Sequence, residues 1–80
     1  MSAQLVLYTR PGCHLCDEAE TLVRGLGGKP ELIDIETDDQ LHRRFLELIP
    51  VIEIGGELAA ELIEFRSQSF ADRVRASLRE

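Results

Sequence analysis

The sequence contains no tryptophan, a single tyrosine and only three phenylalanines among its 80 residues. Basic residues are also scarce, because nine Lys and Arg stand against fifteen Asp and Glu, which gives a formal net charge of −6. A protein that binds a phosphate backbone needs a positive surface, and one that binds unpaired bases needs aromatic side chains for stacking. The composition therefore argues against nucleic-acid binding.

Long apolar runs are absent as well. The apolar runs, such as residues 5–8, are short, whereas a membrane-spanning helix needs about 20 apolar residues. The chain opens with Met1-Ser2-Ala3-Gln4 and lacks the basic start of a secretory signal. We therefore expect a soluble, cytoplasmic protein with no membrane partner, folded as one domain over residues 1–80 and monomeric.

Cysteine is rare too, since the chain has only Cys13 and Cys16. A disulfide between residues three apart closes almost no loop, so it would stabilise the fold little, and two cysteines do not make the framework of a secreted protein. The spacing indicates redox chemistry or metal binding instead.

The first half of the chain predicts a strand, a helix and a second strand. β-forming residues fill positions 4–8, and apolar residues then recur with helical spacing from Cys13 onward. Gly25 or Gly27 is expected to end this helix. Residues 31–35 read as a strand that lies parallel to the first, because a helix connects the two.

The second half predicts a helix, a hairpin and a closing helix. Thr37 or Asp38 can cap the first of these helices, and Gly55-Gly56 suits a tight turn between two short strands. Ser69 and Asp72 form a capping pattern for the last helix. The expected buried positions of the two helices are Leu41, Phe45 and Leu48, and Phe70, Val74 and Leu78. The result is an α/β fold of order β-α-β-α-β-β-α, a four-stranded mixed sheet covered by three helices.

Cys13 is expected at the N-terminus of the first helix, where unpaired N–H groups and the helix dipole stabilise a thiolate. Arg10 and a protonated His14 would add positive charge nearby. Cys16 lies one turn further on, on the apolar side of the helix, and should be less accessible. These positions predict that Cys13 attacks a disulfide and that Cys16 resolves the mixed disulfide.

A second feature of the predicted site is the Ile49-Pro50 bond, which joins a helix to a strand. The inferred topology favours a cis bond at this position. A cis bond would expose the backbone N–H and C=O of Ile49 to the cysteines, so that an extended substrate could add there like a strand. We therefore take Arg10, His14, Ile49 and Pro50 as candidate substrate-binding residues.

With these residues identified, the sequence resembles glutaredoxin-like proteins of the thioredoxin superfamily, especially a small group with Cys-x-Leu-Cys. The resemblance is carried by Tyr8-Thr9-Arg10-Pro11-Gly12-Cys13-His14-Leu15-Cys16, by Ile49-Pro50-Val51 and by the Gly55-Gly56 hairpin. It implies a thioredoxin-like fold, a nucleophilic Cys13, a resolving Cys16 and a cis Pro50. It also places Arg10 where glutaredoxins usually carry a basic residue that binds a glutathione carboxylate.

The chain departs from that family at two points. Glutathione-using glutaredoxins carry Pro and an aromatic residue between the cysteines, where this chain has His14 and Leu15. They also carry a Gly-Gly-x-Asp type motif before the last helix, whereas residues 58–69 contain no glycine. The expected substrates are protein or small-molecule disulfides, and glutathione and a thioredoxin reductase are both candidate electron donors.

Two other function classes compete with the dithiol enzyme. A zinc site needs four ligands, and only His14 and His42 could obviously join the two thiolates, so we expect no cofactor. An iron–sulfur cluster held between two chains through Cys13 is one alternative. A non-catalytic adaptor with a thioredoxin fold is the other.

Overall fold

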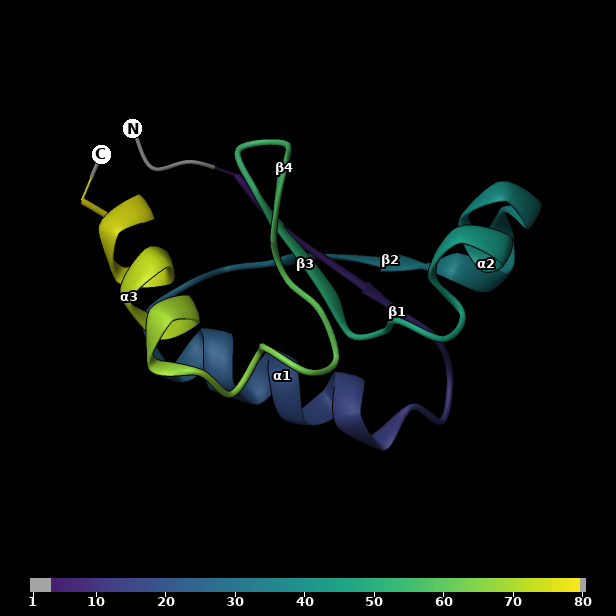
Figure 1. Ribbon diagram of the computed structural model, residues 1–80, viewed down its shortest axis with the longest axis horizontal. Coiled ribbons are helices and arrows are strands. Elements are labelled where there is room, and N and C mark those ends of the chain that lie inside the picture. Colours follow the sequence, from purple (N-terminus) through teal and green to yellow (C-terminus); the bar gives the residue numbers. More distant parts are fainter. Residues whose placement is uncertain (1–3, 80) are drawn as a thin grey trace.

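The computed structural model describes residues 4–79, and its four strands form one mixed sheet in the order β2-β1-β3-β4 (Figure 1). β1 (Leu5–Thr9) lies parallel to β2 (Glu31–Asp34) and antiparallel to β3 (Val51–Ile54). β4 (Glu57–Ala60) pairs with β3 and forms the opposite edge. The element order and the mixed sheet are those that the sequence predicts.

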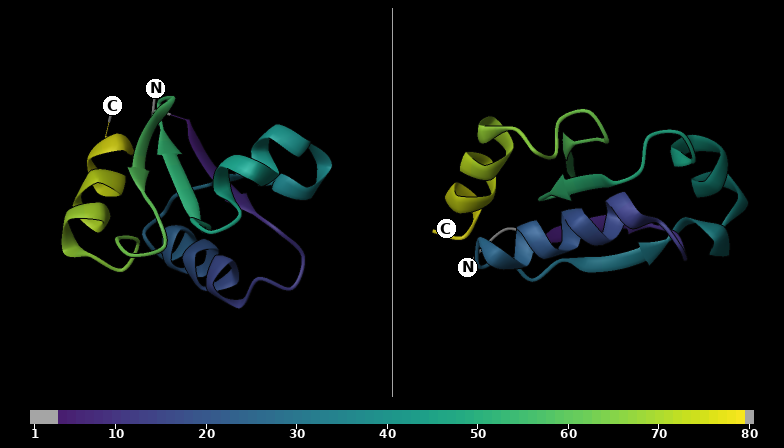
Figure 2. Two further views of the ribbon diagram at one scale, coloured as in Figure 1. Left: turned by 45° about the vertical axis from the view of Figure 1, so that its right-hand side comes forward. Right: turned by 90° about the horizontal axis from the view of Figure 1, so that it is seen from below.

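Three α-helices surround this sheet. α1 (His14–Gly25) and α3 (Gln68–Ser77) pack against one face, while the short α2 (Asp39–Phe45) lies at the end of the sheet away from α3 (Figures 1 and 2). A 3₁₀ helix, η1 (Ile35–Thr37), connects β2 to α2. Within residues 4–79, no helix has the length and apolar character needed to cross a membrane.

The main hydrophobic core fills the space between the sheet and the pair α1 and α3. Leu7 and Ile52 contribute from the sheet, Val23 from α1, and Phe70 and Val74 from α3. All of these side chains are at most 1% exposed. The helical periodicity of α1 and α3 thus predicts which residues reach this core.

A second, smaller cluster lies at the α2 end of the sheet. Its buried members are Cys16, Ile35, Phe45, Ile49 and Val51, and Tyr8, Cys13 and Leu41 pack against it. Both cysteines therefore belong to this cluster.

The turn between β3 and β4 confirms the predicted hairpin. Gly55 and Gly56 have φ values of 62° and 84°. Positive φ at both central residues is the requirement of a two-residue type I′ turn, and glycine adopts it without a steric penalty.

Two predicted boundaries, the end of β2 and the end of α2, are wrong. Ile35 was expected in the strand, but the Asp34 side chain accepts a hydrogen bond of 2.8 Å from the Glu36 N–H and starts η1 there. Leu48 was expected on the buried stripe of α2. The helix ends at Phe45, so Leu48 lies beyond the helical register and is 40% exposed. Asp38 does cap α2, as predicted.

The predicted start of the last helix is wrong by two residues. Ser67 caps α3, and its hydroxyl accepts a hydrogen bond of 3.1 Å from the Phe70 N–H. Ser69 therefore lies inside the first turn of α3. Phe70 and Val74 are buried as expected, and Leu78 packs partly buried against the main core.

Candidate redox site

The loop after β1 delivers Cys13 to the start of α1. Gly12 has a φ of 76° and turns the chain, and the Cys13 N–H donates a hydrogen bond of 3.2 Å to the Arg10 carbonyl oxygen. Cys13 is the N-cap residue of α1, and its Sγ accepts a hydrogen bond of 3.1 Å from the Cys16 N–H. The sulfur thus occupies the place that a capping oxygen usually takes, which satisfies one of the unpaired N–H groups of the first turn.

Cys13 and Cys16 form a disulfide with a Cα–Cα distance of 5.2 Å. The two residues differ in accessibility, since Cys16 is 1% exposed and Cys13 is only partly buried. Among residues 4–79, no group of three His, Cys, Asp or Glu side chains is arranged so that it could hold a metal ion.

The two basic candidates flank Cys13, and each lies near a carboxylate. Arg10 Nη2 is 3.2 Å from Glu36 Oε2 in η1, with both side chains 40% exposed. His14 is exposed on the first turn of α1, where it lines a shallow depression together with Asp17 and Glu18. The Glu36 carboxylate of η1 therefore compensates part of the positive charge that Arg10 would offer to the cysteines.

The bond between Ile49 and Pro50 is cis, as predicted. Pro50 is fully buried, and Ile49 is 8% exposed and packs in the same cluster as Cys16. The expectation that the Ile49 N–H is free for a substrate is wrong. That N–H donates a hydrogen bond of 3.0 Å to the Phe45 carbonyl oxygen, because the chain makes another turn after α2.

Tyr8 packs in the cluster of the cysteines, whereas the sequence identified it only as part of a strand and of the motif that carries the family resemblance. Its ring packs against Phe45 with centroids 4.6 Å apart, and its hydroxyl donates a hydrogen bond of 2.9 Å to Glu53. Burial, followed by the hydrogen bond to Glu53 and the charge of that carboxylate, raises the pKa of Tyr8. The partners lie on β1 and β3, 45 residues apart, so no local pattern reveals the pair.

Arg66 is a second residue that sequence reasoning missed. Its guanidinium donates two hydrogen bonds to the Glu18 carboxylate, one of them 2.8 Å from Nη2 to Oε1. These bonds lower the pKa of Glu18, and the positive charges of Arg66 and His14 lower it further. The ion pair fixes the segment after β4 to the exposed side of α1.

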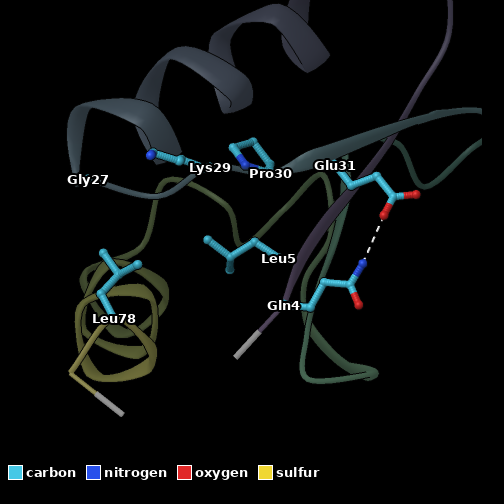
Figure 3. Close-up of a pocket in the computed structure, with 7 residues that line it drawn as sticks. All are labelled: Gln4, Leu5, Gly27, Lys29, Pro30, Glu31 and Leu78. Carbon is cyan, nitrogen blue, oxygen red and sulfur yellow. Dashed lines mark hydrogen bonds between the residues drawn. The ribbon is translucent and has the colours of Figure 1, made fainter. Parts of the chain in front are cut away.

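A pocket of about 540 Å³ lies at the other end of the sheet (Figure 3). It is bordered by Gln4, Leu5, Lys29, Glu31 and Leu78, and Gln4 Nε2 donates a hydrogen bond of 2.8 Å to Glu31 Oε1. Leu5 begins β1, whereas the cysteines follow the end of that strand. The pocket is therefore not part of the cysteine site.

Comparison with known proteins agrees with this geometry. The Glutaredoxin-like domain family (DUF836) matches residues 4–79. The chain belongs to this family. A similar solved structure is the solution NMR structure of protein Ne2328 from Nitrosomonas europaea, which is 25% identical with a TM-score of 0.74. The match covers 91% of this chain and 89% of that one. No match is found among curated proteins.

The glutaredoxin-like domain thus combines a thioredoxin-type α/β fold with a Cys-x-x-Cys pair at the start of α1. This combination is typical of redox proteins.

Proposed function

We propose that this glutaredoxin-like domain is a dithiol thiol–disulfide oxidoreductase. The Cys13 thiolate attacks one sulfur of a substrate disulfide, forms a mixed disulfide and releases the other substrate sulfur as a thiolate. The Cys16 thiolate then attacks Cys13 Sγ, which forms the Cys13–Cys16 disulfide and releases the second substrate thiol. Two electrons pass from the dithiol to the substrate, and the released thiolates take up protons from solvent or from the protein thiols.

The difference in accessibility between the two sulfurs carries this proposal. A nucleophile must reach a partner molecule. Cys13 is partly exposed, while Cys16 is only 1% exposed. The N-cap position of Cys13 adds support. The Cys16 N–H that bonds to Cys13 Sγ at 3.1 Å would bind a thiolate more strongly than a neutral sulfur, and the helix dipole acts in the same direction.

The groups around Cys13 suggest how a substrate would lie. In this proposal the substrate crosses Cys13 between the Arg10 loop and the Ile49–Pro50 bond. The Ile49 N–H is already bonded to Phe45, so the Ile49 carbonyl is the backbone group left for pairing with an extended substrate. Arg10 and His14 would contact groups on the other side of the reacting sulfur.

A single-turnover experiment with reduced protein and a peptide disulfide tests this function. We expect wild type to reduce one disulfide per molecule and Cys13→Ser to reduce none. Cys16→Ser should stop at a mixed disulfide, which mass spectrometry detects as one protein joined to one peptide. Equal rates for wild type and Cys13→Ser would overturn the proposal. Glutathione and a thioredoxin reductase, supplied separately, then identify the electron donor.

A further inference from the structure

A shallow groove lies beside the redox site, between residues 46–49 and residues 61–64. The Leu62 N–H donates a hydrogen bond of 3.0 Å to the Leu48 carbonyl oxygen and joins the two segments. Figure 1 shows the segment after β4 passing across α1, the helix that Cys13 caps. The depression has a volume of about 250 Å³ and is lined by Glu47, Leu48, Glu61, Leu62, Ile63 and Glu64. We refer to it as the Leu48–Ile63 groove.

Two of the three apolar side chains that line this groove are exposed. Ile63 is 93% exposed and Leu48 is 40% exposed. A single exposed aliphatic residue is ordinary on a protein surface. Two of them lining one depression are the arrangement expected of an interaction surface.

The rim of the groove is acidic. Among residues 4–79, none of Glu47, Glu61 and Glu64 belongs to an ion pair. The basic residues His42, Arg43 and Arg44 line a neighbouring depression on the α2 side, which shares Glu47 and Leu48 with the groove. A molecule seated against Ile63 therefore meets the carboxylates of Glu61 and Glu64, which favour a positively charged partner and disfavour an anionic tripeptide such as glutathione.

The groove adjoins the cysteine site along the chain. Leu48 is followed directly by Ile49, which packs in one cluster with Cys16 and with the partly buried Cys13. The Ile49 N–H is bonded to Phe45, so backbone pairing at this point is limited. Side-chain contacts in the adjoining groove would then add to the selection of a substrate.

We infer that the Leu48–Ile63 groove binds a basic and apolar segment next to the disulfide of a protein substrate. An aliphatic or aromatic side chain of that segment packs on Ile63 and Leu48, and its Lys or Arg residues face Glu47, Glu61 and Glu64. The inference rests on the proposed oxidoreductase function, because it names the substrates of that site.

Two synthetic peptides with the same disulfide and the same apolar residues, but with Lys or Glu at the flanking positions, test the inference. We expect reduced protein to react about tenfold faster with the basic peptide at an ionic strength of about 0.01 M, and the difference to shrink at about 1 M. If both peptides are reduced at equal rates at low salt, the groove does not select substrates, although the dithiol function stands.

A third measurement separates the two proposals. A fluorescent basic peptide with serine in place of its cysteines reports binding by anisotropy without any redox step. Salt-sensitive binding of this peptide, together with no reduction of either disulfide peptide, would overturn the proposed function and support docking in the groove. No binding together with equal reduction rates would overturn the docking inference alone.

Variants on β4 provide matched controls, since Glu57 and the 51% exposed Leu58 lie at the other end of the sheet. We expect Glu64→Lys to lower the preference for the basic peptide by about threefold or more, whereas Glu57→Lys leaves it unchanged. Ile63→Ser should weaken binding of the serine-substituted peptide, and Leu58→Ser should not. Equal effects at the two ends would show that only net charge matters and would overturn the inference.

Discussion

Glu18 on α1 and Arg66, which follows it by 48 residues, are joined by two hydrogen bonds between carboxylate and guanidinium. The pair connects the segment after β4 to the helix that carries both cysteines. The Arg66 guanidinium also lies over the Phe65 ring, 4.9 Å from its centroid, and the Phe65 side chain is buried in the main core. The ion pair is thus held next to a buried anchor.

This ion pair predicts a pH dependence of stability. The hydrogen bonds from Arg66 lower the pKa of Glu18 below its ordinary value of 4.5. Stabilisation is therefore fully present above the unfolded-state pKa and is lost as the pH falls through the folded-state pKa. Between about pH 5 and pH 3, the thermal midpoint should fall more steeply in wild type than in Glu18→Gln. Calorimetry measures both curves, and a wild-type slope no steeper than that of the variant would contradict the prediction.

Tyr8 offers a second titration, because it is the only tyrosine and the chain has no tryptophan. Burial and the hydrogen bond to Glu53 raise its pKa above the ordinary value of 10.0. The associated stabilisation is present below pH 10.0 and is lost as the pH rises through the folded-state pKa. Tyrosinate absorbance should show a raised midpoint that Glu53→Gln moves down toward the ordinary value. An equal midpoint in wild type and variant would rule out this role of Glu53.

Gly28 has a steric role that a methyl group tests. A Cβ at this position would lie 2.7 Å from Leu5 Cδ1 and 2.8 Å from Val23 Cγ1, both from buried residues. We expect Gly28→Ala to lower the free energy of unfolding by about 1–3 kcal/mol through overpacking. Gly25→Ala is the control, because its Cβ would meet no atom within 4 Å. Chemical denaturation should separate the two variants, and equal stabilities would be inconsistent with the close approach at Gly28.

The cap of α3 gives a test with two neighbouring serines. The Ser67 hydroxyl accepts the Phe70 N–H, so Ser67→Ala should cost about 0.5–2 kcal/mol of stability. Ser69 lies within the helix and is exposed, so Ser69→Ala should change stability by less than about 0.5 kcal/mol. Thermal or denaturant unfolding checks both values. A larger loss of stability in Ser69→Ala than in Ser67→Ala would show instead that Ser69 caps the helix, as the sequence pattern suggests.

The sequence predicts those parts of the fold that depend on local pattern. The helical spacing around Ala19 and Val23 and the glycine pair at residues 55–56 lead to α1 and to the hairpin, and both are observed. The cap of α3 was harder to predict because two serines compete. Only Ser69 has an acidic residue three positions later, yet the chain path places Ser67 at the helix start.

The site was predictable to a smaller extent. Cys13, Cys16 and the cis Pro50 follow from their positions between predicted elements. The bond from the Ile49 N–H to Phe45 depends on how the chain leaves α2, and Leu48 becomes exposed for the same reason. Pairs such as Glu18 and Arg66 join distant parts of the chain, so only the assembled tertiary structure reveals them.

The two hydrophobic clusters draw buried side chains from different parts of the chain. η1 and α2 contribute buried side chains only to the cluster that holds the cysteines, whereas β4 and α3 contribute only to the main core. Substitutions in residues 35–45 can therefore alter the surroundings of the sulfurs while the principal stabilising contacts stay intact.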